Sequence, residues 1–438
     1  MPIVVQKYGG TSVGDADRIH KVAARISRYV ERGDKVAVTV SAMGRTTDGL
    51  INLAKEMTPR PSRRELDVLM ATGEQQSVAL VTMALHQLGV RARSFTGQQA
   101  GFLTNDLYGG ARILEVNPRG LLEAFKDYDV AVIAGFQGVD GAGNITTLGR
   151  GGSDTTAVAV AAALGARECE IYTDTDGVYT TDPHLIPEAQ KLELVDYDEM
   201  LELASLGAKV LHPRSVWYAR RYGVVIHVRS SFNYNRGTLV KNLKVKDLKV
   251  KDLKREAVKR EAMKTERTVT GVALDRNHAR INLLGVPDVP GVAAQVFSAL
   301  GRSGISADMI IQGVPGNDSS RQQMAFTVNK DQVEDALDAV TPLLASIGGE
   351  ASADRDIAKV SIVGIAIGST PGVAGKMFQA VSEAGANIEM IATSEVRISV
   401  VIPAAKAEEA LRSVHAAFDL DAFDLDKGGA SGAEASGQ

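Results

Sequence analysis

The residues best suited to chemistry follow the first apolar run of the chain. Lys7 ends that run and precedes the glycine-rich segment GGTSVG at residues 9–14. Glycines let backbone N–H groups approach phosphate oxygens, and the start of a following helix favours negative charge. A lysine beside such a loop can neutralise a phosphoryl group during its transfer. Taken alone, the segment is equally compatible with a structural turn beside a surface lysine.

Two further polar segments favour phosphate chemistry. Residues 149–156, GRGGSDTT, add Arg150, whose guanidinium suits a carboxylate or phosphate, and Asp154, which can hold a metal or an ammonium group. Residues 172–183, YTDTDGVYTTDP, combine side chains typical of a nucleotide-binding rim, although taken alone such a segment is more often a polar loop. The chain has neither a Gly-x4-Gly-Lys-Ser/Thr loop nor a His-Arg-Asp catalytic loop, so the two kinase folds that use them are not supported.

The elements that must position these residues alternate in type. Over residues 1–240, short Val/Ile/Ala-rich runs alternate with helical patterns, which is typical of an α/β domain with a largely parallel central sheet covered by helices. We expect strands at 3–7, 35–41, 129–136 and 170–173, and helices at 18–31, 75–87 and 154–164. The candidate loops follow strand ends in this scheme.

The last part of the chain repeats itself. The segment PGVA at residues 290–293 recurs at 371–374, and the same shift relates Gly304 to Gly385. A shift kept without gaps predicts two copies of one module. Each copy reads as a ferredoxin-like βαββαβ unit, and we assign residues 268–348 and 349–427 to them, with a flexible tail at 428–438.

A basic segment at residues 241–267 separates these parts. It carries 11 Lys or Arg against 5 Asp or Glu and repeats five-residue units such as LKVKD. A five-residue step spirals around a helix and alternates faces in a strand, so no apolar face results. We therefore predict a charged linker and no nucleic-acid partner.

Composition narrows the class of protein. The 438 residues have a formal net charge of -4, with 45% hydrophobic and 23% charged residues, which is typical of a globular protein of about two to four domains. The single Cys169 excludes an intrachain disulfide and a Cys-rich metal site, and we predict no protein-built metal site. No apolar run is long enough to span a membrane, and the N-terminus lacks a signal-peptide core, so we expect a cytoplasmic protein with no membrane partner.

Five segments together resemble the aspartokinase family. They lie in the family's order and approximate spacing: VQKYGGTSV at 5–13, VSAMG at 40–44, TGE at 72–74, LGRGGSD at 148–154 and YTTDP at 179–183. The chain is similar to single-function aspartokinases of the amino-acid kinase superfamily, and its repeats resemble their tandem ACT regulatory domains. The resemblance implies transfer of the γ-phosphoryl group of ATP to the side-chain carboxylate of L-aspartate, the first step of lysine, threonine and methionine biosynthesis.

The resemblance also implies roles for single residues. The implied catalytic residues are Lys7, Gly9, Gly10, Arg150 and Asp154. For L-aspartate it implies Arg150 at the α-carboxylate, Glu74 at the α-amino group, and Ser41, Thr47 and Ser153 around the side chain. For ATP, whose phosphates mainly carry the Mg²⁺, it implies Lys7, Tyr8, Gly9, Gly10, Thr173, Asp174, Tyr179, Asp182, His184, Lys209 and Val210. Many relatives carry Arg where this chain has His184. Glu74 is also compatible with a carboxylate at a helix N-terminus.

The repeated modules imply feedback inhibition by threonine, lysine or both. The implied effector-binding residues, each also compatible with fold-forming turns and strand ends, are Asp288, Gly291, Val292, Ala293, Gln312, Ala374, Asn387, Ile388, Ser394 and Glu395. Paired ACT domains usually assemble across subunits, so we expect a homodimer or larger oligomer. Met263 is a candidate internal start for a separate regulatory subunit.

Two other functions stay open at this point. A catalytically silent amino-acid sensor would keep the glycine loops as scaffold, but the presence of Lys7, Glu74, Arg150 and Asp154 argues against it. A sibling kinase for glutamate or acetylglutamate would share the α/β domain, but the VQKYGGTSV start followed by paired modules disfavours it.

Overall fold

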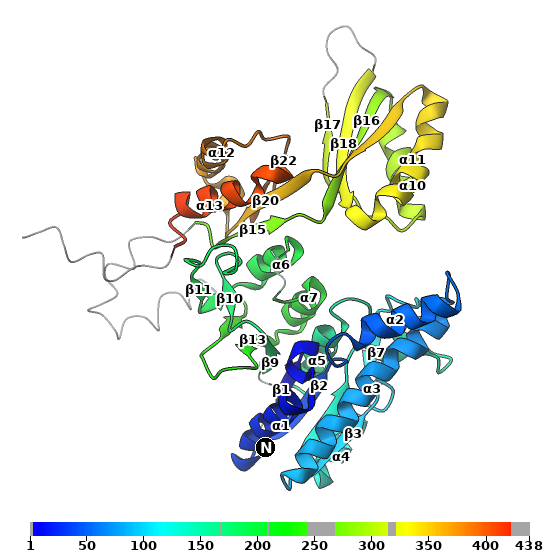
Figure 1. The fold of residues 1–438 in the computed structure, drawn as a ribbon, viewed down its shortest axis with the longest axis vertical. Coiled ribbons are helices and arrows are strands. Elements are labelled where there is room, and N and C mark those ends of the chain that lie inside the picture. Colours follow the sequence, from blue (N-terminus) through cyan, green and yellow to red (C-terminus); the bar gives the residue numbers. More distant parts are fainter. Residues whose placement is uncertain (1–2, 167, 208–209, 244–267, 314–320, 422–438) are drawn as a thin grey trace, which may run out of the picture. The chain divides into compact units, whose positions relative to one another are not determined.

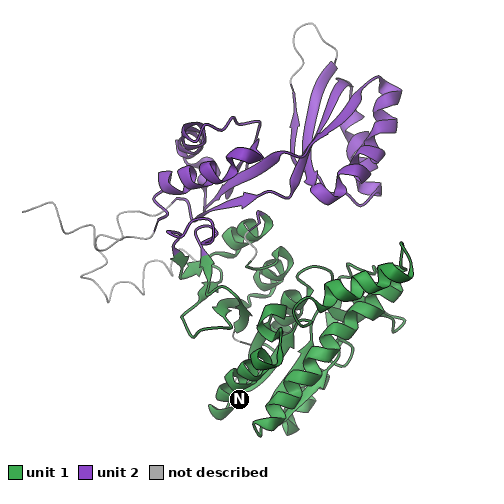
Figure 2. Ribbon diagram, in the orientation of Figure 1, with its two compact units in different colours: residues 1–178, 191–205, 209–264 green, residues 179–190, 206–208, 265–438 purple. Residues whose placement is uncertain are grey.

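The computed structural model describes residues 3–166, 168–207, 210–243, 268–313 and 321–421. They form two compact units (Figure 2). The first comprises Met1–Val178, Lys191–Ser205 and Lys209–Lys264, and the second comprises Tyr179–Gln190, Leu206–Ala208 and Thr265–Gln438. Residues 244–267 of the predicted linker and the predicted tail at 428–438 lie outside the described residues.

An eight-stranded sheet forms the centre of the first unit (Figure 1). The six strands from β13 to β3 in sheet order pair in parallel, and β14 joins β13 antiparallel. This confirms the largely parallel sheet predicted from the sequence. In sheet order the strands are β12 (Leu194–Val195), β14 (Thr238–Val240), β13 (Val225–Ser230), β9 (Glu168–Thr173), β1 (Ile3–Tyr8), β2 (Lys35–Val40), β6 (Val130–Ala134) and β3 (Ala92–Phe95).

Helices cover both faces of this sheet. α1 (Ala16–Glu31) and α3 (Arg63–Gln87) share an apolar core with Val36, Val38 and Val40 of β2. Successive strand residues point to opposite faces. On the other face, α5 (Gly152–Ala163) packs on β1, β2 and β9. Residues 152–161 of α5 are all buried, because its Gly, Ala, Ser, Thr and Val side chains are small enough to let the helix approach the sheet closely.

The remaining elements of the first unit surround this core. A small sheet has the strand order β5-β4-β7-β8, and a two-stranded pair joins β10 to β11. Their bounds are β4 (Phe102–Thr104), β5 (Ile113–Val116), β7 (Gln137–Val139), β8 (Ile145–Thr147), β10 (Val178–Tyr179) and β11 (Lys191–Leu192). The other helices are η1 (Gly10–Val13), α2 (Thr46–Met57), α4 (Arg119–Asp127), α6 (Tyr197–Ser205) and α7 (Pro213–Tyr222).

The second unit contains two four-stranded antiparallel sheets, and their strands interleave along the chain. The first sheet has the order β17-β18-β16-β19 and the second β21-β22-β20-β15. The strands are β15 (Gly271–Asp275), β16 (His278–Pro287), β17 (Asp308–Gln312), β18 (Arg321–Asn329), β19 (Glu350–Asp354), β20 (Ile357–Val363), β21 (Met390–Thr393) and β22 (Arg397–Pro403). The edge strand of the second sheet therefore precedes the whole first sheet in sequence.

This pairing differs from a simple division into residues 268–348 and 349–427. β15 falls in the first range but pairs with β20, while β19 falls in the second range but pairs with β16. The segment Tyr179–Gln190, from within the predicted catalytic range 1–240, also belongs to the second compact unit. The physical reason is that an edge strand needs only a free sheet edge to pair with. A strand can therefore pair with a sheet whose other strands lie elsewhere in the sequence.

Both modules follow one plan. Two helices cover one face of each sheet: α10 (Val292–Arg302) and α11 (Val333–Ile347) in the first, α12 (Val373–Glu383) and α13 (Ala407–Ala417) in the second. Short helical turns at η2 (Lys330–Gln332), η3 (Ile367–Ser369) and η4 (Ala404–Lys406) complete the unit. Gly291 and Gly372 cap α10 and α12 with φ of 98° and 88°, a conformation that favours glycine. The repeated Pro-Gly pair thus makes the same turn twice.

A second apolar cluster joins the two sheets to each other. Met309 of β17, Met390 of β21, Ile357 of β20 and Val401 of β22 are buried together. Among the described residues, no helix is long and apolar enough to cross a membrane.

The junction that admits β15 into the second sheet leaves no room for a side chain at Gly364. A Cβ there would lie 2.0 Å from the Thr268 carbonyl oxygen, whereas a Cβ at Gly375 in α12 meets nothing within 4 Å. We expect Gly364→Ala to lower the melting temperature of the unit, and Gly375→Ala to keep or raise it because alanine favours helix. Thermal unfolding by circular dichroism measures both. Equal melting temperatures would contradict this junction.

Candidate active site

The Lys7 ammonium lies against a buried carboxylate. Its Nζ is 2.6 Å from Oδ1 of Asp154, and each side chain is 12% exposed. Lys7 comes from the end of β1 and Asp154 from the first turn of α5, so the pair joins the centre of the sheet to the helix beneath it. A Cβ at Gly9 would lie 3.3 Å from the same Nζ. The ammonium is therefore held at the glycine turn that follows β1.

That glycine turn packs against the turn after β2. Gly44 N donates to Gly10 O at 3.1 Å, and a Cβ at Gly10 would lie 2.8 Å from Ala42 O. Ser41 N donates to Tyr8 O at 3.1 Å. The Tyr8 ring itself is fully buried and stacks on Tyr172 with 4.7 Å between ring centroids. The two turns thus bring the predicted residues Gly9, Gly10 and Ser41 together, while the Tyr8 side chain points into the core.

Glu74 reaches the same turn from α3. Its Oε1 accepts a hydrogen bond from Ala42 N at 3.1 Å, and its Oε2 is buried with no hydrogen-bond partner in the described part of the chain. Burial raises the pKa of Glu74 to about 7, against the lowering effect of the Ala42 N–H. Thr47 lies on the first turn of α2, after the same segment. An unsatisfied buried carboxylate oxygen is suited to a cationic ligand group.

Glu74 does not lie at a helix N-terminus. The helix predicted at 75–87 begins at Arg63, so Glu74 stands in its middle. The alternative that Glu74 serves the helix dipole is therefore wrong. The helix continues past Glu74 because buried residues precede and follow it in sequence, namely Met70, Ala71, Ser77 and Val78.

The loop that carries Arg150 is shaped by two glycines. Gly149 and Gly151 have φ of 75° and 68°, and Gly151 caps α5. Arg150 between them is exposed. Ser153 on the first turn of α5 is 8% exposed, and its Oγ would lie 2.7 Å from a Cβ at Gly135. The predicted residues Arg150, Ser153 and Asp154 thus come from one turn and the helix that it opens.

His212 is a neighbour of this loop that the sequence analysis missed. A Cβ at Gly151 would lie 2.1 Å from Cγ of the His212 ring. The ring caps α7, since its Nδ1 accepts from Arg214 N at 3.3 Å. Burial lowers the pKa of His212, Asp154 raises it, and Arg214 and Arg150 lower it. The only local signal at His212 is the proline that follows it, which is typical of the first residue of a helix. That signal predicts a helix cap at His212 and does not indicate a functional site.

The residues predicted for nucleotide fall in different parts of the chain. Thr173 ends β9 and Asp174 follows it, and the Thr173 hydroxyl donates to Asp174 Oδ1 at 3.0 Å. Val210 belongs to the first unit, and Lys209 lies outside the described residues. Tyr179, Asp182 and His184 belong to the second unit.

Thr180 fixes the segment Tyr179–Gln190 within the second unit. Its Oγ1 lies 2.9 Å from Nε2 of His415 on α13, and its carbonyl accepts from Val272 N of β15 at 2.7 Å. His415 Nδ1 in turn lies 2.9 Å from Asp421 Oδ1. Three predicted nucleotide residues therefore stand on a segment bonded to the second module.

Carboxylates and a histidine also gather on the α1 side of the sheet. Ligand atoms of Glu168, Glu170 and His227 lie within 4.8 Å of one another. However, the Glu170 oxygens already accept from four donors, namely Gln6, Tyr29, Tyr172 and Arg229. The nearby guanidinium opposes a cation, so this cluster fits a role in holding β1, β9 and β13 together.

The residues predicted for effectors lie on the two modules. Gly291, Val292 and Ala293 open α10, and Ala374 lies in the matching turn of α12. The polar members are exposed: Asp288, Gln312, Asn387, Ser394 and Glu395, with Ile388 half-buried among them. Asp288 Oδ1 accepts from Gln322 Nε2 at 3.1 Å.

Ion pairs border the apolar cluster between the two sheets. Lys359 of β20 is 2% exposed, and its Nζ lies 2.9 Å from Asp308 Oδ2 of β17. Burial raises the pKa of Asp308, but Lys359, Arg397 and the Met309 backbone N–H together lower it below its usual value. Arg280 of β16 donates to Glu389 at 2.6 Å, beside Asn387 and Ile388.

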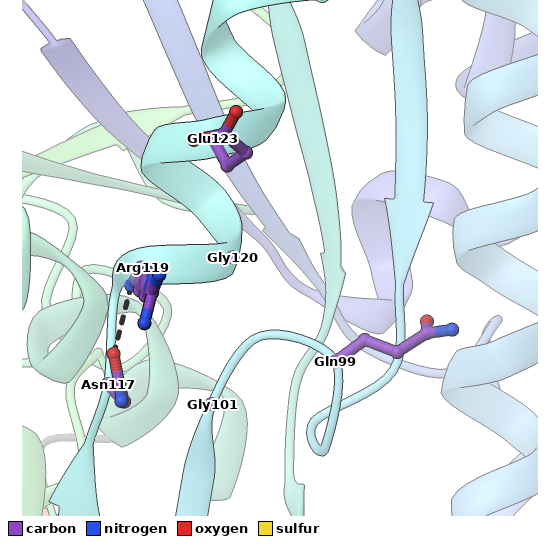
Figure 3. A pocket seen from close by; sticks show the side chains of 6 residues that line it. All are labelled: Gln99, Gly101, Asn117, Arg119, Gly120 and Glu123. Atoms are coloured by element: carbon purple, nitrogen blue, oxygen red, sulfur yellow. Dashed lines mark hydrogen bonds between the residues drawn. The ribbon is translucent and has the colours of Figure 1, made fainter.

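A hollow of the surface lies away from these residues (Figure 3). It has a volume of about 440 Å³ where the turn before β4 meets the start of α4. A Cβ at Gly101 would lie 2.1 Å from Asn117 O, and Asn117 Oδ1 accepts from Arg119 N at 3.1 Å. The hollow is lined by Gln99, Gly101, Asn117, Arg119, Gly120 and Glu123, none of which was predicted for the site.

Comparison with known proteins assigns the family. The amino acid kinase family model matches residues 2–230, and the ACT domain model matches residues 281–342 and 360–418. An aspartokinase from Thermus thermophilus is 64% identical over 421 residues, which cover 96% of this chain and all of that protein.

The chain belongs to the aspartokinase family. Among solved structures of the family, E. coli aspartokinase III in complex with aspartate and ADP (R-state) is 26% identical with a TM-score of 0.77, covering 95% of this chain and 99% of that one. The same enzyme in complex with lysine and aspartate (T-state) is 26% identical with a TM-score of 0.67, covering 94% and 99%. The resemblance drawn from five short segments is thereby confirmed, and the ACT matches fall on the two repeated modules.

Gly151 and Gly143 offer a matched test of the Arg150 loop. Both have φ in the left-handed region, 68° and 84°, but a Cβ at Gly143 meets nothing within 4 Å while one at Gly151 meets the His212 ring. Alanine at either position costs about 1–2 kcal/mol of backbone strain. We expect Gly151→Ala to lower the melting temperature clearly more than Gly143→Ala does. Equal losses in thermal unfolding would mean that His212 does not pack on this loop.

Proposed function

We propose that the chain transfers the γ-phosphoryl group of ATP to the side-chain carboxylate of L-aspartate, giving 4-phospho-L-aspartate and ADP. The observation that carries this proposal is the Lys7 ammonium, held by Asp154 at a glycine turn that follows the central strand. Aspartokinase III, which resembles this chain over nearly its full length, forms a complex with aspartate and ADP. The same pair of ligands is the simplest expectation here.

Phosphoryl transfer to a carboxylate requires that the two substrates are positioned and that the negative charge of the phosphoryl group is compensated. The side-chain carboxylate of free aspartate is already ionised at neutral pH, since such groups titrate near about 3.9. One of its oxygens attacks the γ-phosphorus, a new O–P bond forms, and the bond to the β,γ-bridging oxygen breaks, with its electron pair leaving on ADP. No proton has to be removed, so Lys7 acts by placing positive charge beside the transferring oxygens.

Two charged groups are suited to the amino-acid end of the substrate. Glu74 has an unpartnered buried oxygen for the α-ammonium group, and Arg150 is exposed between two glycines for the α-carboxylate. Ser41, Thr47 and Ser153 are placed on the segments around them and supply hydroxyls for the side chain. Asp154 keeps the Lys7 ammonium oriented and compensates part of its charge.

For the nucleotide, we propose the Gly9 and Gly10 amides together with Thr173 and Asp174 of the first unit. The other residues that the family resemblance implies for ATP, namely Tyr179, Asp182, His184, Lys209 and Val210, stay sequence-based predictions. Mg²⁺ fits best on the phosphate oxygens of ATP, because the carboxylate nearest Lys7 is already paired with an ammonium. When bound there, the ion neutralises phosphate charge.

We also propose feedback inhibition by lysine, threonine or both through the two ACT modules. E. coli aspartokinase III forms a T-state complex with lysine and aspartate, which supports lysine first. Assembly through the modules into a homodimer or larger oligomer is proposed with it. A separate regulatory subunit that starts at Met263 remains a sequence-based prediction.

The direct test is ATP-dependent formation of an acyl phosphate, trapped by hydroxylamine, with L-aspartate and with L-glutamate as control substrate. We expect hydroxamate from L-aspartate only, a loss of at least about a hundredfold in Lys7→Ala because charge compensation is removed, and inhibition by lysine or threonine. Folded protein that forms no hydroxamate but binds lysine or threonine would favour the silent sensor. Product from L-glutamate instead would favour the sibling kinase.

The raised pKa of Glu74 predicts a pH dependence of substrate binding. Only ionised Glu74 attracts the α-ammonium group, which stays protonated over this range. With a pKa of about 7, we expect the KM for L-aspartate to fall roughly tenfold between pH 6 and pH 8, with the KM for ATP little changed. Glu74→Gln should have a high KM for L-aspartate that no longer depends on pH.

Stability supplies the control for this variant. Above its ordinary value of 4.5 the unfolded Glu74 ionises, while the folded one keeps its proton to about pH 7, so this residue lowers stability as pH rises through that window. Glutamine has no such cost, so Glu74→Gln should unfold at pH 8 at a temperature no lower than the native chain. A pH-independent KM in the native enzyme would contradict the role of Glu74.

A further inference from the structure

Asp67 is a fully buried carboxylate on α3 that the proposed chemistry does not use. It accepts three hydrogen bonds from uncharged donors. Oδ2 accepts from Gly109 N at 3.0 Å and from Thr147 N at 2.8 Å, and Oδ1 accepts from the Thr147 hydroxyl at 2.7 Å. Burying a carboxylate costs free energy of folding unless its oxygens accept good hydrogen bonds. The segments that Asp67 binds therefore indicate what this carboxylate is for.

The two partners of Asp67 lie directly beside the Arg150 loop. Thr147 ends β8, and Leu148, Gly149 and Arg150 follow it. A Cβ at Gly149 would lie 3.1 Å from Gly109 O, so the turn at Gly109 abuts the left-handed turn at Gly149. The Asp67 carboxylate therefore fixes both the start of the Arg150 loop and the turn that supports it.

The helix that carries Asp67 also carries Glu74. The two residues are seven positions apart, which places them on one face of α3, about 10 Å apart along its axis. Both are buried, and each accepts a backbone N–H from a different loop: Gly109 and Thr147 for Asp67, and Ala42 for Glu74. One rigid helix thus anchors the Glu74 carboxylate and the base of the loop that bears Arg150.

We propose that Asp67 is a positioning residue that fixes Arg150 relative to Glu74 and so sets selectivity for the α-carboxylate of the substrate. The inference rests on the proposed function, in which these two groups bind the two ends of the α-amino acid. Asp67 touches no reacting atom. It acts through Thr147 and Gly109.

Asparagine and alanine at position 67 separate geometry from charge. In Asp67→Asn the amide oxygen can accept both backbone N–H groups, and the amide NH₂ can donate to the Thr147 hydroxyl, which then accepts. In Asp67→Ala all three donors lose their partner. A positioning role therefore predicts that asparagine preserves function and alanine does not. A role for negative charge predicts that both fail.

The test compares L-aspartate with its α-amide, in which the α-carboxylate is neutral. The readout is the ratio of kcat/KM for the two substrates in the full-length enzyme. We expect Asp67→Ala to lower this ratio at least about tenfold, chiefly through the KM for L-aspartate, with the KM for ATP within about threefold. Asp67→Asn should stay within about threefold of the native ratio. Thr147→Val removes the hydroxyl donor only, so its kcat/KM ratio should lie between the ratios of Asp67→Ala and Asp67→Asn.

Asp129→Ala is the control for a general loss of stability. Asp129 precedes β6, and its carboxylate accepts hydrogen bonds from Lys35 and Arg91, neither of which belongs to the Arg150 loop. The Asp129→Ala variant should have a lower melting temperature and an unchanged ratio of kcat/KM for the two substrates.

Three outcomes would overturn the inference. The first is a native ratio in folded Asp67→Ala with both kcat/KM values unchanged, the second is a native ratio in which both values fall equally, and the third is an alanine-like loss in Asp67→Asn. If Asp67→Ala does not fold, Thr147→Val decides, since a native ratio there also overturns it. Failure of the proposed function is distinct: the native enzyme would then form no hydroxamate from L-aspartate.

Discussion

The contact between Lys7 and Asp154 is the interaction around which the catalytic unit is arranged. Two charges that are each about nine-tenths shielded from water lose much of their hydration, and only close pairing offsets that loss. Pairing requires α5 to lie almost against β1, which explains why its buried residues are small. The same closeness leaves no room for a side chain at Gly135, where a Cβ would lie 2.7 Å from Oγ of Ser153 on α5. The small residues of α5 and the glycine at position 135 thus both fit the close approach that the ion pair requires.

The second requirement of the site is a fixed distance between loops that are far apart in sequence. A parallel sheet gathers strand ends at one edge, but it does not fix the turns beyond them. α3 does so, because it binds the turn after β2 through Glu74 and the end of β8 through Asp67. A helix is stiffer than any of the loops it touches, so it is the natural element to set their spacing.

Much of this arrangement followed from local sequence signals. The glycine turns, the parallel sheet, the buried alanine-rich helix and the repeated modules each have a short-range pattern, and five segments were enough to identify the family. The early start of α3 was missed because residues 63–69 are largely polar and Gly73 interrupts the helical pattern. His212 was missed because its role depends on packing against Gly151, and no spacing in the sequence reports that contact.

The exchange of edge strands between the modules could not be predicted from the repeat, because a repeat shows which segments are alike but not which strand pairs at the edge of each sheet. It also restricts how such a protein can be rearranged. Excising either module at the limits of its sequence repeat would leave the other without its fourth strand and expose an unpaired edge. The two modules must therefore be transplanted or fused together, as one continuous segment that runs from β15 to the end of the second module.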